Sequence, residues 1–308
     1  MSAKIKLLER ISILEATLAL PVLINQPLAN VAHNKTATFL RKGLGIVTFN
    51  ILEDYIKERT LEMFSSVSSS MISFSFLPDD LQEAATLGAL RALVGKVRNE
   101  KKSRGNWLGL IQNETAKINS TSLVNNFTIS QFSLMSENSN INADEISKVL
   151  KCLNINGGWD TLQRISREIY GGVPSLNQSY ENISMRRHSA AHEAGFDYEY
   201  GWLQAALTEI IAVAASFDIA LSAKCRIINL SPTVQVAKDD LANKIKYRFL
   251  HQFNNSHIYK EKKSVQSVSV KNWTDLDSAK QILVPRCQTQ SESLIILNSQ
   301  ARIIDWFA

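Results

Sequence analysis

Residues 36–64 form a long amphipathic stretch, and they limit the fold more than any other segment. Apolar side chains recur there at the spacing of one helix face, at Leu40, Leu44, Val47, Ile51 and Tyr55. Charged side chains fall on the other face, at Glu53, Asp54, Lys57, Glu58 and Arg59. This period predicts one helix of about eight turns. Because such a helix needs partners along its apolar face, the pattern indicates a helical bundle.

Helical spacing continues on both sides of this stretch. The N-terminal residues repeat apolar side chains at helical intervals, and Glu15 interrupts the apolar run, so we expect a helix that stays with the folded protein rather than a signal sequence. The pattern predicts further helices at residues 81–97, 107–118, 143–153, 159–170, 180–194 and 200–223. Residues 200–223 are so apolar that we expect them in the bundle core.

The hydrophobic pattern changes after Cys225, where short β-favouring runs replace the helical period. These runs are residues 226–230, 244–253, 265–270, 281–284, 294–297 and 301–306. The expected fold is therefore mainly α, with a helical domain at residues 1–224. We expect residues 225–308 to form a small, separately packed β-rich module.

Composition sets wide limits on function. The chain has 308 residues, of which 45% are hydrophobic and 20% charged, and this balance excludes a wholly disordered chain. Its net charge of +5 is compatible with a polyanionic partner. The three cysteines lie far apart, which is typical of free thiols in the reducing cytoplasm. No uncharged apolar run reaches the ~18 residues of a membrane span, so we expect no membrane association.

One short segment carries most of the functional information. Residues 185–193 read Met-Arg-Arg-His-Ser-Ala-Ala-His-Glu, so that four residues separate Arg187 from His192 and polar His188 follows the arginine directly. This pattern resembles the signature of the HEPN superfamily (higher eukaryotes and prokaryotes nucleotide-binding). Residues 40–45 and 49–56 also look like the first long helix of HEPN proteins in the ribonuclease-associated bacterial branch. The resemblance covers about residues 36–222.

The resemblance implies a HEPN-like helical bundle that acts as an endoribonuclease. It also implies that two motifs meet across a homodimer, so that two arginines and two histidines share one cleft.

Metal-free cleavage of RNA explains why the motif contains these residue types. A base must take the proton of the 2′-hydroxyl as it attacks phosphorus, and an acid must protonate the leaving 5′-oxygen. Imidazole suits both tasks. We assign acid–base work to His192, charge stabilisation to Arg187 and an orienting role to His188. Arg186 is expected to add affinity for RNA phosphate. The reaction needs no cofactor.

Other residues are candidates for RNA binding or for orientation of the motif. Tyr198 and Tyr200 could stack bases or belong to the core. Glu53 or Asp54, as in some HEPN proteins, could orient Arg187 or His192, or lie in solvent. Lys246 and Arg248 belong to a tail region in which basic and aromatic residues alternate. That alternation also fits a strand with Tyr247 and Phe249 inside and the cations in water.

Several alternatives stay open from the residues alone. The motif arginine and histidine could be structural, forming salt bridges or a helix cap. His188 and His192 share a helix face, but Ser189 stands where a zinc protease needs glutamate, and no third ligand has a recognisable spacing. The basic run Lys96, Arg98, Lys101, Lys102 and Arg104 is either a solvated helix end or a contact for the RNA backbone.

Two function classes follow. The first is a metal-independent endoribonuclease of the toxin or antiphage-defence kind, with RNA, a second copy of the chain and an antitoxin or defence protein as partners. The second is a non-catalytic HEPN module that binds a nucleotide, RNA or a protein.

Overall fold

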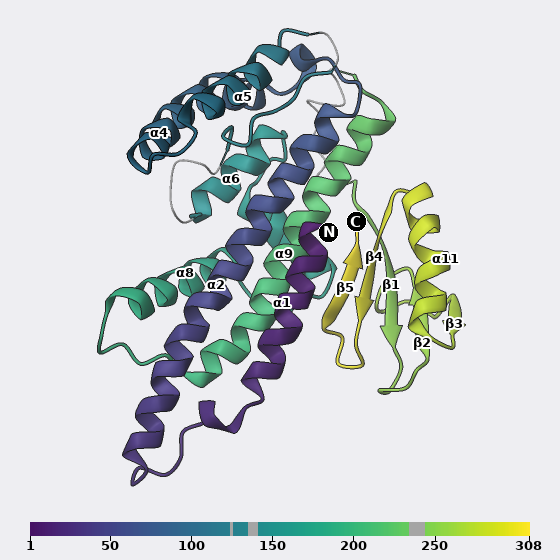
Figure 1. Ribbon diagram of the computed structural model, residues 1–308. Coiled ribbons are helices and arrows are strands. Elements are labelled where there is room, and N and C mark those ends of the chain that lie inside the picture. The colour runs from purple at the N-terminus through teal and green to yellow at the C-terminus, as the bar shows by residue number, and fades with distance from the viewer. Residues whose placement is uncertain (124–125, 135–140, 234–243) are drawn as a thin grey trace. The chain divides into compact units, whose positions relative to one another are not determined.

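The computed structural model describes residues 1–123, 126–134, 141–233 and 244–308 (Figure 1). It is mainly helical, with a small mixed sheet at the C-terminal end, which confirms the predicted fold class. The chain divides into two compact units, each built from separate segments. Unit 1 comprises Met1–Ile56, Leu162–Ile219 and Ile245–Ala308, and unit 2 comprises Lys57–Thr161 and Ala220–Lys244.

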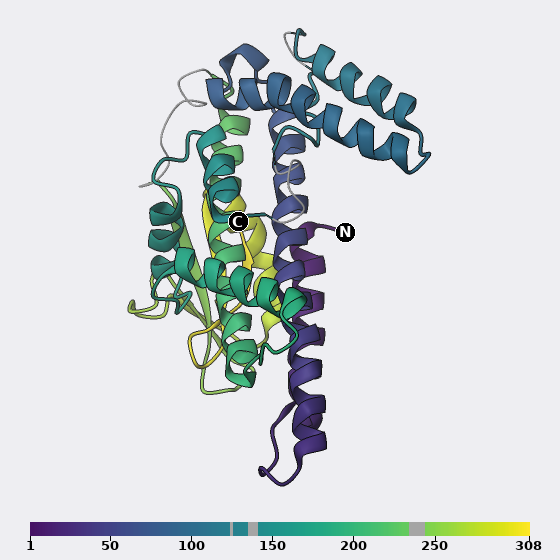
Figure 2. The same cartoon turned by 90° about the vertical axis from the view of Figure 1, so that its left-hand side faces the viewer.

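Three long helices run side by side in unit 1 (Figures 1 and 2). They are α1 (Ala3–Leu18), the first part of α2 (Val31–Ser68) and most of α9 (Tyr200–Leu230). A short 3-10 turn, η1 (Pro21–Leu23), precedes α2. The Tyr55 hydroxyl on α2 donates a hydrogen bond to the Ala214 carbonyl of α9 at 3.3 Å. This hydrogen bond joins α2 to α9 within the layer of long helices on which the rest of unit 1 packs.

Two shorter helices complete the helical part of unit 1, most of α7 (Trp159–Glu168) and α8 (Leu176–His192). Serine 175 starts α8, because its side chain accepts a hydrogen bond from the Gln178 amide at 3.4 Å. The ring of Tyr180 on α8 packs 5.7 Å from that of Phe49 on α2. In Figure 1, α8 and the sheet lie on opposite sides of α9.

The C-terminal sheet has the strand order β3-β2-β1-β4-β5. Its strands are β1 (Lys246–Gln252), β2 (Tyr259–Lys262), β3 (Lys271–Trp273), β4 (Glu292–Leu297) and β5 (Ile303–Phe307). The β1 and β4 strands are parallel, whereas the other neighbours are antiparallel. Helix α11 (Leu276–Thr289) joins β3 to β4 and packs Leu283 against Leu250 and Leu294 of the sheet.

The sheet packs on the helices of unit 1. The Trp306 indole of β5 is buried and donates a hydrogen bond to the Asp218 carboxylate of α9 at 2.8 Å. Lys4 on α1 pairs with Asp305 at 2.9 Å. The expectation of a separately packed tail is therefore wrong, because β5 shares its buried contacts with α1 and α9. The domain boundary after residue 224 stays a prediction, and α9 runs through that point to Leu230.

Unit 2 is helical. It contains the end of α2, the turn η2 (Phe74–Phe76), and a continuous helical run of α3 (Asp79–Glu83), a π-helical turn (Ala84–Gly88) and α4 (Ala89–Lys102). Helices α5 (Trp107–Ser120) and α6 (Ala143–Cys152) follow, and the last part of α9 completes the unit. Parts of the predicted loop between α5 and α6, residues 124–125 and 135–140, lie outside the described residues.

The predicted strands were partly wrong. Residues 226–230 continue α9, and residues 281–284 lie inside α11, which begins because Asp275 accepts a hydrogen bond from the Ser278 amide at 2.8 Å. Residues 265–270 form no strand. The two runs that lie in helices are short apolar segments, a pattern that buried helices and buried strands have in common. The predictions at residues 244–253, 294–297 and 301–306 are confirmed by β1, β4 and β5.

Helix α2 is confirmed, but its buried face differs from the predicted one. Val47 is 48% exposed, whereas Arg41 and Glu53 are buried at 2% and 4% exposure. The physical reason is visible at Arg41, whose guanidinium donates to the carbonyls of Leu23 and Tyr198 at 3.0 and 2.6 Å. A buried cation with such partners looks like a solvent-facing residue in the sequence.

Helix α9 is long and apolar enough to cross a membrane by length and composition. In the folded chain, however, 67% of its most apolar window is buried. Leu203, Ile210 and Phe217 are all fully covered by neighbouring elements. These contacts confirm the prediction that this segment is a core helix.

Candidate active site

The motif occupies the C-terminal end of α8. Arg187 and His188 lie in its last turns, and His192 is its final helical residue. Cationic side chains are favoured at this end of a helix because they face the negative pole of the helix dipole. Helix α8 ends there, and the Glu193 amide still donates to the Ser189 carbonyl at 2.9 Å.

The two histidines form a pair on the surface. Their ring centroids are 4.6 Å apart, with the planes tilted by 49°, and both side chains are exposed. Residues four apart on a helix lie on the same face, which is why the rings meet. The pair places two proton-transfer groups side by side where a polynucleotide can reach them.

Arg187 faces another side of the helix. Its side chain is half-buried, and its Nε is enclosed without a hydrogen-bond partner. A five-residue step turns the helix so that Arg187 and His192 point about 140° apart around the axis. Within the described residues, its guanidinium makes no hydrogen bond to either imidazole. One chain thus presents the arginine and the histidines on separate sides of α8.

Arg186 is held against the protein. Its guanidinium carbon lies 4.7 Å from the ring centroid of Trp202 on α9, a cation–π contact. The carboxylate of Glu209 lies within its electrostatic reach. Burial raises the pKa of Glu209, while Arg186 and a hydrogen bond from Ser179 act in the opposite direction. The expected role of Arg186 in phosphate binding stays a prediction.

The loop that follows the motif is fastened to α2 by residues that the sequence analysis gave no role. The Lys42 ammonium donates to the carbonyls of Glu193 and Ala194 at 2.7 and 3.1 Å, and Arg41 donates to the Tyr198 carbonyl. Gly45 admits the Tyr198 ring, since a Cβ at that position would lie 2.1 Å from the ring. The only sequence signal was that residues 40–45 belong to the segment that resembles HEPN proteins.

The two tyrosines near the motif are structural in this conformation. Tyr198 is fully buried, and burial raises the pKa of its hydroxyl to about 12. Its ring therefore presents no face for base stacking, which corrects the suggested RNA contact. Tyr200 is half-buried, and its hydroxyl donates to the Leu18 carbonyl of α1 at 2.7 Å.

The two suggested orienting acids have different surroundings. Asp54 is exposed and pairs with Arg10 of α1 at 2.9 Å. Glu53 is buried in α2. Within the described residues, the Asp54 carboxylate pairs with Arg10 and not with Arg187 or His192. Their orienting role stays a prediction.

The two basic candidates in the tail also differ. Lys246 is exposed at the start of β1. Arg248 is buried, and its guanidinium makes two hydrogen bonds with the Glu292 carboxylate at 2.9 and 3.0 Å. Glu261 of β2 also pairs with Arg248, at 3.5 Å. The expected exposure of Arg248 is therefore wrong, because strand β1 turns this cation toward the buried carboxylate of Glu261 and the half-buried carboxylate of Glu292.

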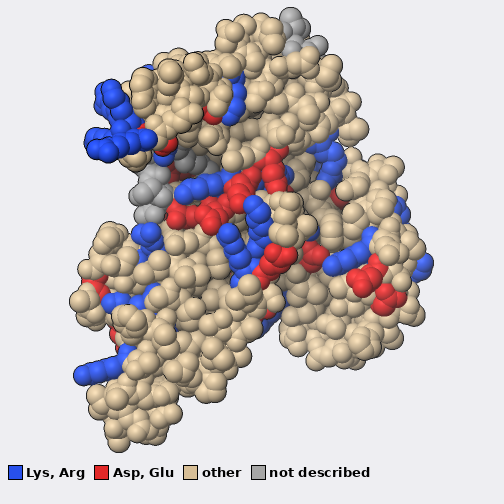
Figure 3. Space-filling model, viewed as in Figure 1, with Lys and Arg blue, Asp and Glu red and all other residues tan. Residues whose placement is uncertain are grey.

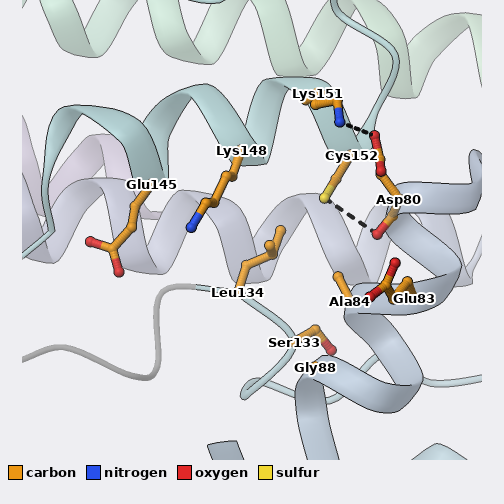
Figure 4. Close-up of a pocket in the computed structure, with 10 residues that line it drawn as sticks. All are labelled: Asp80, Glu83, Ala84, Gly88, Ser133, Leu134, Glu145, Lys148, Lys151 and Cys152. Carbon is orange, nitrogen blue, oxygen red and sulfur yellow. Dashed lines mark hydrogen bonds and ion pairs between the residues drawn. The ribbon is translucent and has the colours of Figure 1, made fainter. Parts of the chain in front are cut away.

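A cavity of about 350 Å³ in unit 2 is lined by a thiol, that of Cys152, and Figure 4 shows this thiol beside Asp80. The Cys152 thiol donates a hydrogen bond to the Asp80 carbonyl at 3.6 Å, and Lys151 pairs with the Asp80 carboxylate at 3.1 Å. Burial raises the pKa of Cys152 to about 12, so the thiol is protonated at neutral pH and is a poor nucleophile. Within the described ranges, no three His, Cys, Asp or Glu side chains cluster as metal ligands.

A helical bundle in which a late helix ends on an arginine, a polar residue, three further residues and a histidine defines a HEPN domain. A family model described as RiboL-PSP-HEPN matches residues 6–223, and the chain belongs to this family. The HEPN resemblance is thereby confirmed. The match contains the motif and ends before the C-terminal sheet. Searches of curated proteins and of solved structures gave no match. Family membership suggests a nuclease or another RNA-related role.

Proposed function

We propose that this protein is a metal-independent endoribonuclease whose active site is formed by two α8 motifs in a homodimer. The observation that supports this best is the exposed imidazole pair of His188 and His192 on one side of α8, together with Arg187 on another side, whose Nε has no hydrogen-bond partner. Two proton-transfer groups and one cation are the groups that RNA cleavage without a metal requires.

In the proposed reaction, one imidazole takes the proton of the ribose 2′-hydroxyl. The 2′-oxygen attacks phosphorus while the bond between phosphorus and the 5′-oxygen breaks, and a second imidazole protonates that oxygen. The products are a 2′,3′-cyclic phosphate and a 5′-hydroxyl end. Arg187 binds the equatorial oxygens as their charge grows, and His188 orients the phosphate.

A second copy of the chain would supply what one copy lacks. Arg187 and His192 point to different sides of α8, so two motifs that face each other across a two-fold axis can place an arginine of one chain beside a histidine of the other. Such a cleft also contains two histidines for the acid and base tasks. The proposed cellular setting is that of a cytoplasmic toxin or antiphage-defence effector with an antitoxin or defence partner, and it follows the HEPN resemblance.

The test is cleavage of total RNA in EDTA by the purified chain. We expect Arg187→Ala and His192→Ala to lower the rate by about a hundredfold or more, because each removes a group that acts in the transition state. His188→Ala should lower it less. His257→Ala and Arg91→Ala, which change exposed residues that are not part of α8, are the matched controls. Circular dichroism checks that every variant is folded.

Full activity of the Arg187→Ala and His192→Ala variants would contradict the proposal. The alternative is a non-catalytic HEPN module that binds a nucleotide, RNA or a protein partner. Its supporting observation is that a single chain keeps Arg187 and His192 apart. Binding of RNA by wild-type protein without any cleavage in the dimeric state would favour this alternative.

A further inference from the structure

A cavity of about 1190 Å³ lies in unit 1, between α9 and the turn that joins β4 to β5. Its walls come from the end of α7 and the turn at residues 171–174, from α9 residues 204–211, from Glu15 of α1, and from the turn between β4 and β5 with the start of β5. None of the residues of the α8 motif lines it. The cavity therefore joins the family-matched helices to the C-terminal sheet, which has no assigned role.

Two arginines enter this cavity from different elements. Arg167 belongs to α7 and Arg302 to the turn before β5, and both side chains are exposed. Within the described residues, neither guanidinium has an ion-pair or hydrogen-bond partner. Since guanidinium groups bind phosphate or carboxylate with paired hydrogen bonds, the walls are suited to an anionic ligand.

The inner wall carries polar atoms that lack partners. Ser166 is 1% exposed, and its hydroxyl makes no hydrogen bond. The Oε2 atom of Glu209 is likewise enclosed without a partner. Buried polar atoms are nearly always paired, so orphans in a cavity wall are places where a ligand can form hydrogen bonds. The carboxylate of Glu209 accepts donors such as amino or hydroxyl groups.

Tyr170 adds an aromatic surface and a strained backbone. It is the second residue after the end of α7, where Gly171 donates its amide to the Ser166 carbonyl at 2.8 Å. Its φ of 61° lies in the left-handed region that glycine prefers at this position. The ring is half-buried and meets Phe249 edge to face, with centroids 6.2 Å apart. A tyrosine kept at a glycine position beside a cavity points to a use for its ring.

We propose that this cavity binds a nucleoside phosphate. Arg167 and Arg302 hold the phosphate, Tyr170 stacks on the base, and Glu209 and Ser166 meet donors of the base or ribose. A volume above the usual range of roughly 300–1,000 Å³ for ligand sites leaves room for such a molecule with bound water. None of the motif residues lines this cavity, although Glu209 lies within the electrostatic reach of Arg186, and the cavity gives the C-terminal sheet a role in ligand recognition.

The experiment is calorimetric titration of the full chain with 5′-AMP and 5′-GMP, with adenosine and inorganic phosphate as comparison probes. We expect at least one nucleotide to bind saturably with one site per chain, and both comparison probes to bind at least about tenfold more weakly. Arg302→Ala and Glu209→Gln should each weaken nucleotide binding about tenfold or more. Arg91→Ala, which removes an exposed arginine in unit 2, should leave it unchanged.

The test separates this proposal from the proposed nuclease activity. Arg187→Ala and His192→Ala should keep nucleotide binding, whether or not they cleave RNA. The proposal is overturned if neither nucleotide binds at millimolar concentration, or if inorganic phosphate binds as tightly as the nucleotides. It is also overturned if Arg187→Ala abolishes binding while Arg302→Ala and Glu209→Gln do not. Thermal melting of each variant identifies any loss that comes from unfolding.

Discussion

Gly45 shows how one residue of α2 sets the position of the segment after the motif. A methyl group at Gly45 would overlap the Tyr198 ring at 2.1 Å, and the ring is fully buried. We expect Gly45→Ala to destabilise the chain by about 1–3 kcal/mol, because the core must shift to accept it. It should also lower RNA cleavage, since the displaced loop follows His192 directly. Chemical denaturation and the cleavage assay measure the two effects.

Gly43 is the matched control on the same helix. A Cβ at Gly43 meets no atom within 4 Å, so Gly43→Ala should raise stability by up to about 1 kcal/mol through helix propensity. It should leave cleavage unchanged. Equal effects of the two substitutions would show that the contact between Gly45 and Tyr198 does not position the loop.

At the residue scale, the sequence was sufficient to find the HEPN motif at residues 187–192, because its spacing is a local pattern, while the catalytic roles of Arg187, His188 and His192 stay predictions. It was not sufficient to find Arg41 and Gly45. Arg41 looks like part of a solvated face, and only the folded chain brings the Tyr198 carbonyl to it. Arg248 was misjudged for the same reason, since strand alternation predicts a direction but not the carboxylates that it meets.

At the scale of elements, the α4–α5 hairpin carries an exposed cluster of cations at its tip, as Figure 3 shows. Three of these residues are Lys101, Lys102 and Arg104, none of which forms an ion pair with a described residue. The Lys101 ammonium lies 5.4 Å from the ring centroid of Trp107, which is 37% exposed. Cations beside an exposed ring are suited to single-stranded RNA.

We expect the triple variant Lys101→Gln, Lys102→Gln and Arg104→Gln to weaken RNA binding and to flatten its salt dependence. Each lost phosphate contact should reduce the logarithmic slope by about 0.7, and three contacts therefore by about 2. The affinity is measured by fluorescence anisotropy in a His192→Ala background, so that the RNA stays intact.

A control triple variant changes the net charge equally at dispersed exposed sites, with Lys35→Gln, Lys148→Gln and Lys271→Gln. If it flattens the slope as much as the hairpin variant, the tip is merely a solvated helix end. Lys246→Gln, measured in the same series, tests the RNA contact predicted for β1.

The helices of the chain were predictable because their hydrophobic period is long and local. The sheet was only partly predictable. Strand β2 was not predicted because its sequence Tyr-Lys-Glu-Lys is mostly polar. Glu261 in this strand is nevertheless fully buried, and its charge is compensated by ion pairs. Residues 281–284 looked like a strand ending at Pro285, yet α11 includes that proline. Pairing between distant strands decides these cases, and no local pattern reports it.

At the scale of the whole molecule, the composite site predicts a stable homodimer. We expect light scattering at micromolar concentration to give twice the chain mass of 34.4 kDa, because one chain keeps Arg187 and His192 on separate sides of α8. Cleavage should fall as dilution separates the chains. A monomer with full activity would refute the shared cleft.

The division of the chain into two units was beyond sequence reasoning. The change of hydrophobic pattern near Cys225 suggested a single domain boundary along the sequence. Each unit, however, contains segments that are far apart in the chain. Contacts such as Trp306 with Asp218 decide this grouping, and they depend on the tertiary structure alone.

The pairing of α1 with β5 also has a consequence for synthesis on the ribosome. Lys4 and Asp305 are 301 positions apart, so unit 1 cannot close until translation has passed β5. Unit 2 has all of its segments once Lys244 has been made. The α8 motif thus emerges well before its scaffold is complete. A nascent chain that lacks β5 would therefore carry the α8 motif on a unit that is still missing its last strand.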